Sequence, residues 1–329
     1  TDTEKDLEAA GAETLAGATV LLVEDNEINQ QVAMEILSGA GIRVTVAGNG
    51  QEALNRVRAN AYDAVLMDVQ MPVMDGHTAA RKIRELEAER PPARRLPIIA
   101  MTAHAMSGDH ERSLAAGMDD HITKPIDPPR LFGTLAKWIG PRGPAGKQAA
   151  ATPPRATPSA GELVLPETLP EFELAEGLQR LMGNRALYRK LLVNFAAQYA
   201  RAGAEVRQAL DAGDFDRAHG LVHAVKGVAG NLSAKGLQAQ SMALEKLVKH
   251  ADPGNPPGKA ELDAAFVAFR DALGRALSAL EPLVPSSAAA APPAEGAAGA
   301  LPPALAREAA RRLREAAELG DVSGLAAIC

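Results

Sequence analysis

The first half of the chain alternates short apolar runs with longer amphipathic stretches. Short apolar runs that are bounded by turns and separated by helical periodicity are typical of βα repeats around a parallel sheet. Five such repeats fit between residues 18 and 140, which indicates an α/β domain with a doubly wound, five-stranded sheet. We expect strands at 19–23, 42–46, 64–67, 98–101 and 121–123, and helices that include 27–38, 51–58 and 76–87.

The second half shows helical periodicity and no strand pattern. Three short segments interrupt the periodicity: Gly183–Asn184, Gly213–Asp214 and the run DPGNPP at 252–257. The connections between the helices are therefore short. Several helices with short connections predict an all-α antiparallel bundle. The helical segments that we expect are 174–182, 186–200, 204–212, 215–228, 237–250 and 260–280.

Composition divides the chain into domains and linkers. Pro, Ala and Gly dominate two stretches that can bury little, and we expect these to be flexible linkers. Thr1 stands where an initiator Met would be, and the last helical pattern is cut off by the chain end, so we expect a fragment of a longer protein. The expected division is a leader at 1–17, an α/β domain at 18–140, a linker at 141–165, a helical domain at 166–284, a linker at 285–303 and a helical tail at 304–329.

Charge and cysteine content exclude several classes of function. Among 329 residues, 35 Lys and Arg face 41 Asp and Glu, so the net charge of −6 does not favour binding to nucleic acid. One cysteine, Cys329, excludes an internal disulfide and a cysteine-rich zinc site. No run approaches the ~18 apolar residues of a membrane span, and no signal-peptide pattern opens the chain. We therefore expect a cytoplasmic fragment that contacts neither nucleic acid nor membrane.

Polar residues follow the predicted strands of the α/β half where each strand ends. Glu24 and Asp25 end the first apolar run, Asp68 the third, Thr102 the fourth and Lys124 the fifth. Ligands of open α/β sheets bind at this edge. Three crowded carboxylates repel one another, and Lys124 together with an oxygen-ligated Mg²⁺ would compensate them. Such a site suits phosphoryl transfer to a carboxylate, and the central Asp68 is the natural nucleophile.

Each of these residues alone has a simpler interpretation. An Asp at a strand end is usually a turn or cap residue, and Glu24–Asp25–Asn26 before a helix can be only a cap. Thr102 taken alone is an ordinary strand residue. The ordered set, with each member at the end of a strand, favours the phosphoryl site.

The α/β half resembles the receiver domains of two-component signalling, which have a flavodoxin-like fold. The resemblance implies that Asp68 is phosphorylated, with Glu24, Asp25, Asp68 and the backbone carbonyl of Gln70 holding Mg²⁺. It further implies that Thr102 and Lys124 contact the phosphoryl oxygens and that the bond from Lys124 to Pro125 is cis. The motifs that carry the resemblance are VLLVEDNEINQ (20–30), DAVLMDVQMPVMDG (63–76), LPIIAMTAHAM (96–106) and GMDDHITKPI (117–126).

His121 departs from the receiver pattern at the switch position. Many receivers carry Tyr or Phe three residues before the Lys, and Thr102 would be the other switch residue. An imidazole is smaller and can carry charge, so coupling to output can differ. The alternative is that His121 is a tolerated, half-exposed strand residue.

One histidine of the helical half has unusual neighbours. On a helix, His223, Lys226, Gly227 and Gly230 share a face. Two glycines inside a helix each cost about 1 kcal/mol, and the clearance that they give to an approaching domain is a reason for them. Lys226 adds positive charge where a phosphoryl group would sit, so His223 is suited to phosphoramidate chemistry. The alternative is a surface histidine among small residues.

A metal site at this histidine is not supported by the sequence. His219 lies one turn before His223, but no third ligand is evident and the positive charge of Lys226 disfavours a cation. For His219 we therefore prefer a surface role.

The helical half resembles histidine-containing phosphotransfer (Hpt) domains. The resemblance implies a four-helix bundle in which His223 is phosphorylated. Ser233 stands where family members commonly have Gly, which affects only the local helix end. The matching segments are FELAEGLQRLMGNRALYRKLLVNF (172–195) and DFDRAHGLVHAVKGVAGNLSA (214–234).

Together the resemblances imply a phosphorelay and a hybrid histidine kinase as the parent chain. The fragment lacks a kinase ATP-binding core, so Asp68 would receive phosphate from an upstream kinase histidine. It would pass the phosphate to His223, and from there to the Asp of a downstream response regulator. A regulatory module that only docks remains an alternative, as does an Asp-dependent phosphatase, although the phosphatase class generally needs an acid where this chain has Gln70.

Overall fold

The computed structural model describes residues 15–89, 94–102, 107–140, 165–249, 251 and 257–284. All of these lie within one compact unit, Thr1–Val284. The expected leader lies largely outside the described residues, as does nearly all of the first linker; the second linker and the helical tail lie wholly outside them. Among the described helices, none combines the length and apolarity needed to cross a bilayer.

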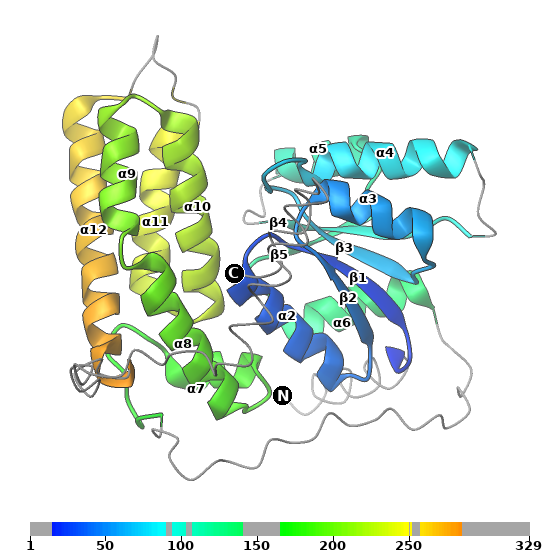
Figure 1. The fold of residues 1–329 in the computed structure, drawn as a ribbon, viewed down its shortest axis with the longest axis horizontal. Coiled ribbons are helices and arrows are strands. Elements are labelled where there is room, and N and C mark those ends of the chain that lie inside the picture. The colour runs from blue at the N-terminus through cyan, green and yellow to red at the C-terminus, as the bar shows by residue number, and fades with distance from the viewer. Residues whose placement is uncertain are drawn as a thin grey trace, which may run out of the picture. The chain divides into compact units, whose positions relative to one another are not determined.

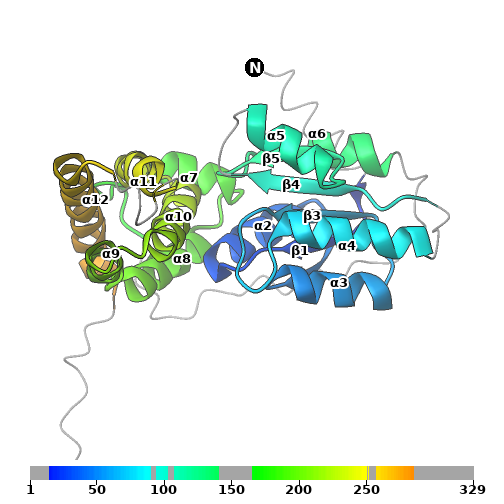
Figure 2. The same ribbon diagram turned by 90° about the horizontal axis from the view of Figure 1, so that it is seen from above.

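A five-stranded parallel sheet forms the centre of the first domain (Figures 1 and 2). The strand order is β2-β1-β3-β4-β5, so the chain winds outward in both directions from β1 and β3. Every residue of β3 and β4 is buried, because helices cover both faces of a parallel sheet. The strands are β1 (Thr19–Val23), β2 (Arg43–Ala47), β3 (Ala64–Asp68), β4 (Ile98–Thr102) and β5 (Asp120–Thr123).

The helices of this domain lie on both faces of the sheet. Alternate strand residues join two separate apolar cores, one with α2 (Glu27–Gly39) and α6 (Pro128–Ile139), the other with α3 (Gly50–Ala59) and α4 (Gly76–Glu89). The fifth helix, α5 (Ser107–Ala115), packs beside β5. This layering leaves the carboxyl ends of the strands open for a site.

The second domain is built only from helices (Figure 1). The helices from α8 to α12 pack against one another as an antiparallel bundle, and the shorter α7 packs on α8. The helices are α7 (Leu174–Arg180), α8 (Arg185–Tyr199), α9 (Ala202–Asp211), α10 (Phe215–Asn231), α11 (Lys235–Val248) and α12 (Lys259–Leu280), followed by a short 3₁₀ turn, η1 (Glu281–Leu283).

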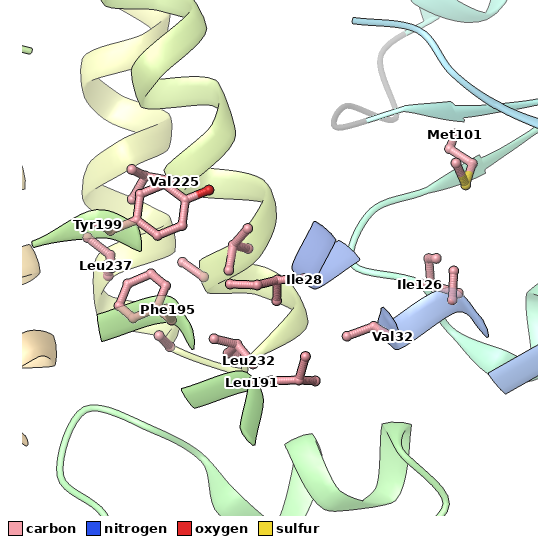
Figure 3. Close-up of a cluster of buried hydrophobic side chains, with 14 of the residues drawn as sticks. Ile28, Val32, Met101, Ile126, Leu191, Phe195, Tyr199, Val225, Leu232 and Leu237 are labelled. Atoms are coloured by element: carbon pink, nitrogen blue, oxygen red, sulfur yellow. The ribbon is translucent and has the colours of Figure 1, made fainter. Parts of the chain in front are cut away.

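The two domains share an apolar contact. The core that includes α2 and α6 continues into the core of the helical bundle. Figure 3 shows Ile28 and Val32 of α2 on one side of this cluster and Leu191 and Leu232 of the bundle on the other. Docking therefore removes the exposed face of α2 from water, and burial of such apolar surface is the main favourable term in association.

The fold class predicted from the sequence is confirmed. The strand at 19–23 is predicted residue for residue, and β3, β4 and β5 each differ from the prediction by one residue at one end. The strand expected at 42–46 lies one residue later, since Ile42 precedes β2 and is buried against the first core.

We predict that Gly76→Ala destabilises the first domain by about 1–3 kcal/mol. A Cβ at Gly76, the first residue of α4, would fall onto the carbonyl oxygen of Asp68, which is backbone and cannot swing aside. As a matched control, Gly133→Ala in α6 meets nothing within 4 Å and should leave stability unchanged or raise it by up to ~1 kcal/mol. Thermal denaturation compares the two, and equal melting temperatures would contradict the clash.

Candidate functional site

Three carboxylates meet at the carboxyl edge of the sheet. Glu24 and Asp25 follow the last residue of β1, and Asp68 ends the neighbouring β3. One carboxylate oxygen from each lies within 4.8 Å of the others. Glu24 and Asp68 are buried whereas Asp25 is exposed, so the cluster opens to solvent on one side. Oxygen atoms in this number and spacing suit Mg²⁺, which prefers oxygen ligands.

Lys124 neutralises part of this charge. Its Nζ donates to Asp68 Oδ2 at 2.5 Å and to Glu24 Oε2 at 2.6 Å. The peptide bond from Lys124 to Pro125 is cis, as the resemblance implied. Burial would lower the pKa of Lys124, but Asp68 and Glu24 raise it well above its usual range, so the ammonium stays charged.

Negative charge is still in excess at the cluster. Burial raises the pKa of Glu24, Lys124 lowers it and Asp68 raises it, to a net value of about 7. The pKa of Asp25 is also raised, by burial and then by Asp68. A divalent cation would relieve this repulsion, so the residues present fit a magnesium ion.

Neighbouring polar groups hold the cluster in place. Asn29 Nδ2 donates to Glu24 Oε1 at 2.8 Å, and Gln30 Nε2 donates to the Glu24 carbonyl oxygen at 2.7 Å. Asn26, and not the two acids, caps α2 by accepting from the backbone N–H groups of Ile28 and Asn29. The cap interpretation therefore holds for Asn26 and leaves Glu24 and Asp25 available to the site.

The remaining predicted residues of the α/β half lie at the same edge. Thr102 ends β4 and is buried, and its carbonyl oxygen accepts from the Lys124 backbone N–H at 2.6 Å. The backbone N–H of Gln70 lies 3.3 Å from Asp68 Oδ1. The fold thus brings together all five polar residues that the sequence placed at strand ends.

A second charged cluster surrounds His223 on α10. Its Nδ1 lies 2.6 Å from Oε1 of Glu245, a residue of α11. Lys226 Nζ donates to Oε2 of the same carboxylate at 2.5 Å. Lys226 is only 2% exposed, so its ammonium is committed to Glu245 and does not stand open beside the imidazole as the sequence suggested.

Glu245 is the functional residue that the sequence reasoning missed. Burial would raise its pKa, but the hydrogen bond from His223 and the charge of Lys226 lower it to about 2. An ionised carboxylate can only accept, so the proton of neutral His223 lies on Nδ1 and the other ring nitrogen keeps its lone pair. A signal was present, because Glu245 falls eight residues after Leu237 and four after Ser241, on the apolar stripe of α11.

Both clusters line one cavity of about 680 Å³. The acidic edge contributes Glu24, Asp25 and Asp68, and α10 contributes His219 and His223. Groups from two domains thus face the same space.

Comparison with known families now identifies both domains. Residues 20–136 match the model of the response regulator receiver domain, and residues 190–281 match the model of the Hpt domain. Residues 20–136 therefore form a receiver domain, and residues 190–281 form an Hpt domain. We refer to the α/β domain as the receiver and to the helical bundle as the Hpt domain.

Two bacterial histidine kinases are similar to this chain. The sensor histidine kinase GacS of Pseudomonas protegens is 33% identical over 249 residues, which cover 75% of this chain and 26% of GacS. The kinase BarA of Escherichia coli K12 is 33% identical over 181 residues, covering 55% of this chain and 18% of BarA. The chain thus spans about a quarter or less of the length of these relatives.

Solved receiver structures are also similar. One of them is the receiver domain of the Pseudomonas aeruginosa sensor kinase PA1611, which was crystallised with magnesium in its active-site cleft. It is 45% identical with a TM-score of 0.35, and the match covers 38% of this chain and 99% of the PA1611 chain. The receiver domain of Saccharomyces cerevisiae Ssk1, in complex with the phosphotransfer protein Ypd1, gives a match of 33% identity and a TM-score of 0.36, covering 38% of this chain and 90% of that chain.

A buried polar network joins the receiver to the Hpt domain. Asn231 Nδ2 donates to Asn29 Oδ1 at 2.8 Å, and Asn29 in turn donates to Glu24. Asn26 Nδ2 donates to the hydroxyl of Tyr199 at 2.8 Å. These amides can pair only when the two domains are docked, so they fix the register of the contact.

Arg180 of α7 adds hydrogen bonds at the same contact between the domains. Its Nε donates to the carbonyl oxygen of Ile126 in the receiver at 3.2 Å, and its Nη1 donates to Ser233 Oγ at 2.9 Å. Ser233 has a positive φ of 56°, a conformation that favours Gly. The hydrogen bond to Arg180 satisfies the buried hydroxyl, which helps to explain how a serine is accommodated there.

Gly227 and Gly230, two of the three glycines of α10, lie near receiver residues. A Cβ at Gly227 would come within 3.5 Å of Asn29 Nδ2, and one at Gly230 would come within 3.5 Å of Pro125 and 2.6 Å of Gln238. The two 3.5 Å distances to the receiver are ordinary van der Waals contacts, and the tight approach at Gly230 is to Gln238 of α11 within the same domain. These distances alone therefore do not require glycine for clearance from the receiver, as the sequence had suggested.

His121 packs against another histidine, with the two ring planes tilted by 50°. The ring centroids of His110 and His121 lie 4.4 Å apart, and both rings carry a shielded Nδ1 that has no hydrogen-bond partner within the described ranges. Burial, followed by His110, lowers the pKa of His121, which favours the neutral form of this imidazole.

We predict that Glu245→Gln destabilises the Hpt domain by about 3 kcal/mol at pH 7, because Lys226 is left buried without a counter-charge. The native pKa of about 2 lies below the usual 4.5, so this stabilisation is complete above pH 4.5 and is lost as the pH falls towards 2. The difference between wild type and variant should therefore shrink over that range. Urea unfolding followed by circular dichroism measures it.

The exposed Glu261 of α12 provides the control. Glu261→Gln should change the free energy of unfolding at pH 7 by no more than about 0.5 kcal/mol, as expected for an exposed surface residue. A Glu245→Gln curve that runs parallel to wild type as the pH falls would contradict the charge assignment.

Proposed function

We propose that the chain relays a phosphoryl group from Asp68 to His223. The single observation that carries this is that the two side chains line the same cavity. In this proposal Asp68 receives the phosphoryl group from the histidine of an upstream kinase core, and His223 delivers it to the Asp of a separate response regulator. The relatives named as histidine kinases support these partners.

The acidic edge would act on the receiver phosphoryl group. Glu24, Asp25, Asp68 and the backbone carbonyl of Gln70 are the proposed ligands of Mg²⁺, which when bound neutralises charge on the phosphoryl oxygens. Thr102 and Lys124 are placed to contact those oxygens. Lys124 must then exchange part of its contact with Asp68 for the phosphoryl group, and the retained Glu24 contact keeps the ammonium near.

The transfer from receiver to Hpt domain is a displacement at phosphorus. The lone pair of the His223 nitrogen that does not face Glu245 attacks; a P–N bond forms as the P–O bond to Asp68 breaks. The electron pair leaves with the Asp68 carboxylate. Positive charge that develops on the imidazole is stabilised by Glu245 through its hydrogen bond to Nδ1. Because both groups are held in one chain, alignment is a large part of what the protein supplies.

We predict that Asp68→Asn abolishes labelling of the receiver by radiolabelled acetyl phosphate with Mg²⁺, because the amide cannot form an acyl phosphate. His223→Gln should keep the Asp68 label but block export to a response regulator, and a glutamine amide still donates to Glu245. Acid and base stability of the label separates acyl phosphate from phosphoramidate.

Matched controls lie on the same elements. Asp63→Asn, just before the other end of β3, should label normally, since an amide oxygen can still accept from Thr19 N–H. His219→Gln, one turn before His223, should leave the relay intact. If His223→Gln still exported phosphate, the relay assignment would be wrong. If the receiver were never labelled, the alternative of a regulatory module that only docks would be favoured.

We further predict that transfer occurs within one chain. Tethering gives the two domains an effective concentration on the order of millimolar, so at micromolar protein the intrachain route should exceed the interchain one by roughly 100-fold or more. Mixing the Asp68→Asn chain with the His223→Gln chain should therefore label His223 far more slowly than wild type at equal total concentration. Equal rates would contradict an intrachain route.

A further inference from the structure

We propose that His219, His223 and Glu245 form a binding site for a zinc ion at the phosphotransfer histidine. His219 and His223 lie one turn apart on α10, with ring centroids 5.9 Å apart. Glu245 reaches them from α11, and one ligand atom from each of the three lies within 4.8 Å of the others. The sequence offered no third ligand, and the fold supplies it.

The donor atoms favour zinc over magnesium. Two imidazole nitrogens and one carboxylate oxygen are a set that zinc takes with the fourth position left for water. The acidic edge of the receiver offers only oxygen atoms, which suit magnesium. The same cavity thus presents two sites that differ in donor type, and excess magnesium should not compete for the histidine site.

His219 is available as a ligand. Its Nε2 is shielded from solvent and makes no hydrogen bond within the part of the chain that the structure describes; the Glu245 oxygen lies 3.6 Å away. A buried polar atom without a partner calls for an explanation, and a bound ion is one. Burial lowers the pKa of His219, which keeps the imidazole in the neutral form that binds metals.

Glu245 can serve zinc and Lys226 together. Its Oε2 accepts from Lys226, whereas its Oε1 faces the two histidines. The carboxylate is ionised at neutral pH, as a metal ligand must be. The positive charge of Lys226 opposes a cation, so we expect zinc to bind more weakly here than at closed structural sites.

Zinc at this site would stop His223 from accepting phosphate, a consequence that rests on the proposed relay. Without zinc, Nδ1–H donates to Glu245 and the other nitrogen keeps its lone pair. When Nδ1 ligates zinc, its proton moves to the other ring nitrogen and no proton is lost overall. That nitrogen then has no lone pair in the ring plane with which to attack phosphorus.

The binding test uses the full chain with excess Mg²⁺ and isothermal titration of zinc chloride. We expect His219→Gln to weaken zinc binding by on the order of 10- to 100-fold. His77→Gln is the control, because His77 lines the same cavity from the receiver. It should bind as wild type does. Equal zinc affinity of wild type and His219→Gln would overturn the site.

The functional test repeats acetyl phosphate labelling with and without zinc. Wild type should lose the His223 label and keep the Asp68 label, whereas His219→Gln should keep both at the same zinc concentration. Zinc that binds but leaves His223 labelling unchanged would overturn the blocking effect. If His223 never labels without zinc, the relay fails instead, and the binding isotherm still decides the zinc site.

Discussion

Buried carboxylates that must be paired with cations dominate both sites of this protein. A carboxylate removed from water is costly unless charge and hydrogen bonds compensate it. In the receiver, Lys124 bridges Glu24 and Asp68. In the Hpt domain, Lys226 and His223 share Glu245. In each arrangement, the contacts that pair a buried carboxylate also hold a potential phosphoryl acceptor in position. Stability and chemistry therefore depend on the same contacts.

The two sites differ in how much of their carboxylate charge is balanced by neighbouring groups. At the receiver edge, three carboxylates face one ammonium. Burial and, to a smaller extent, Asp68 raise the pKa of Glu24 despite the opposing charge of Lys124. At α10 the carboxylate is fully compensated, and its pKa of about 2 reflects that. A magnesium ion would therefore complete the first site electrostatically, whereas the second already positions its imidazole. The amides of Asn29 and Asn231 connect the two, since Asn29 holds Glu24 and accepts from Asn231.

Most of the fold could be predicted because local patterns encode it. β3 and β4 are buried along their whole length and appear as uninterrupted apolar runs, and the glycines and Asn residues between segments mark the turns. Strand order and the contact between the domains could not be predicted in the same way. They depend on pairings such as Asn26 with Tyr199, which are 173 residues apart and leave no periodic signal.

The residues of the candidate sites also divide into those that the sequence predicted and those that only the structure showed. The sequence by itself determined Glu24, Asp25, Asp68, Thr102 and Lys124, because the ends of parallel strands must meet at one edge. It also singled out His223, through the glycines that follow it. Only the tertiary structure decided that Lys226 is buried and that Glu245 orients the imidazole. Their roles depend on how α10 and α11 pack, and one turn of relative displacement would separate them while leaving each helix pattern unchanged.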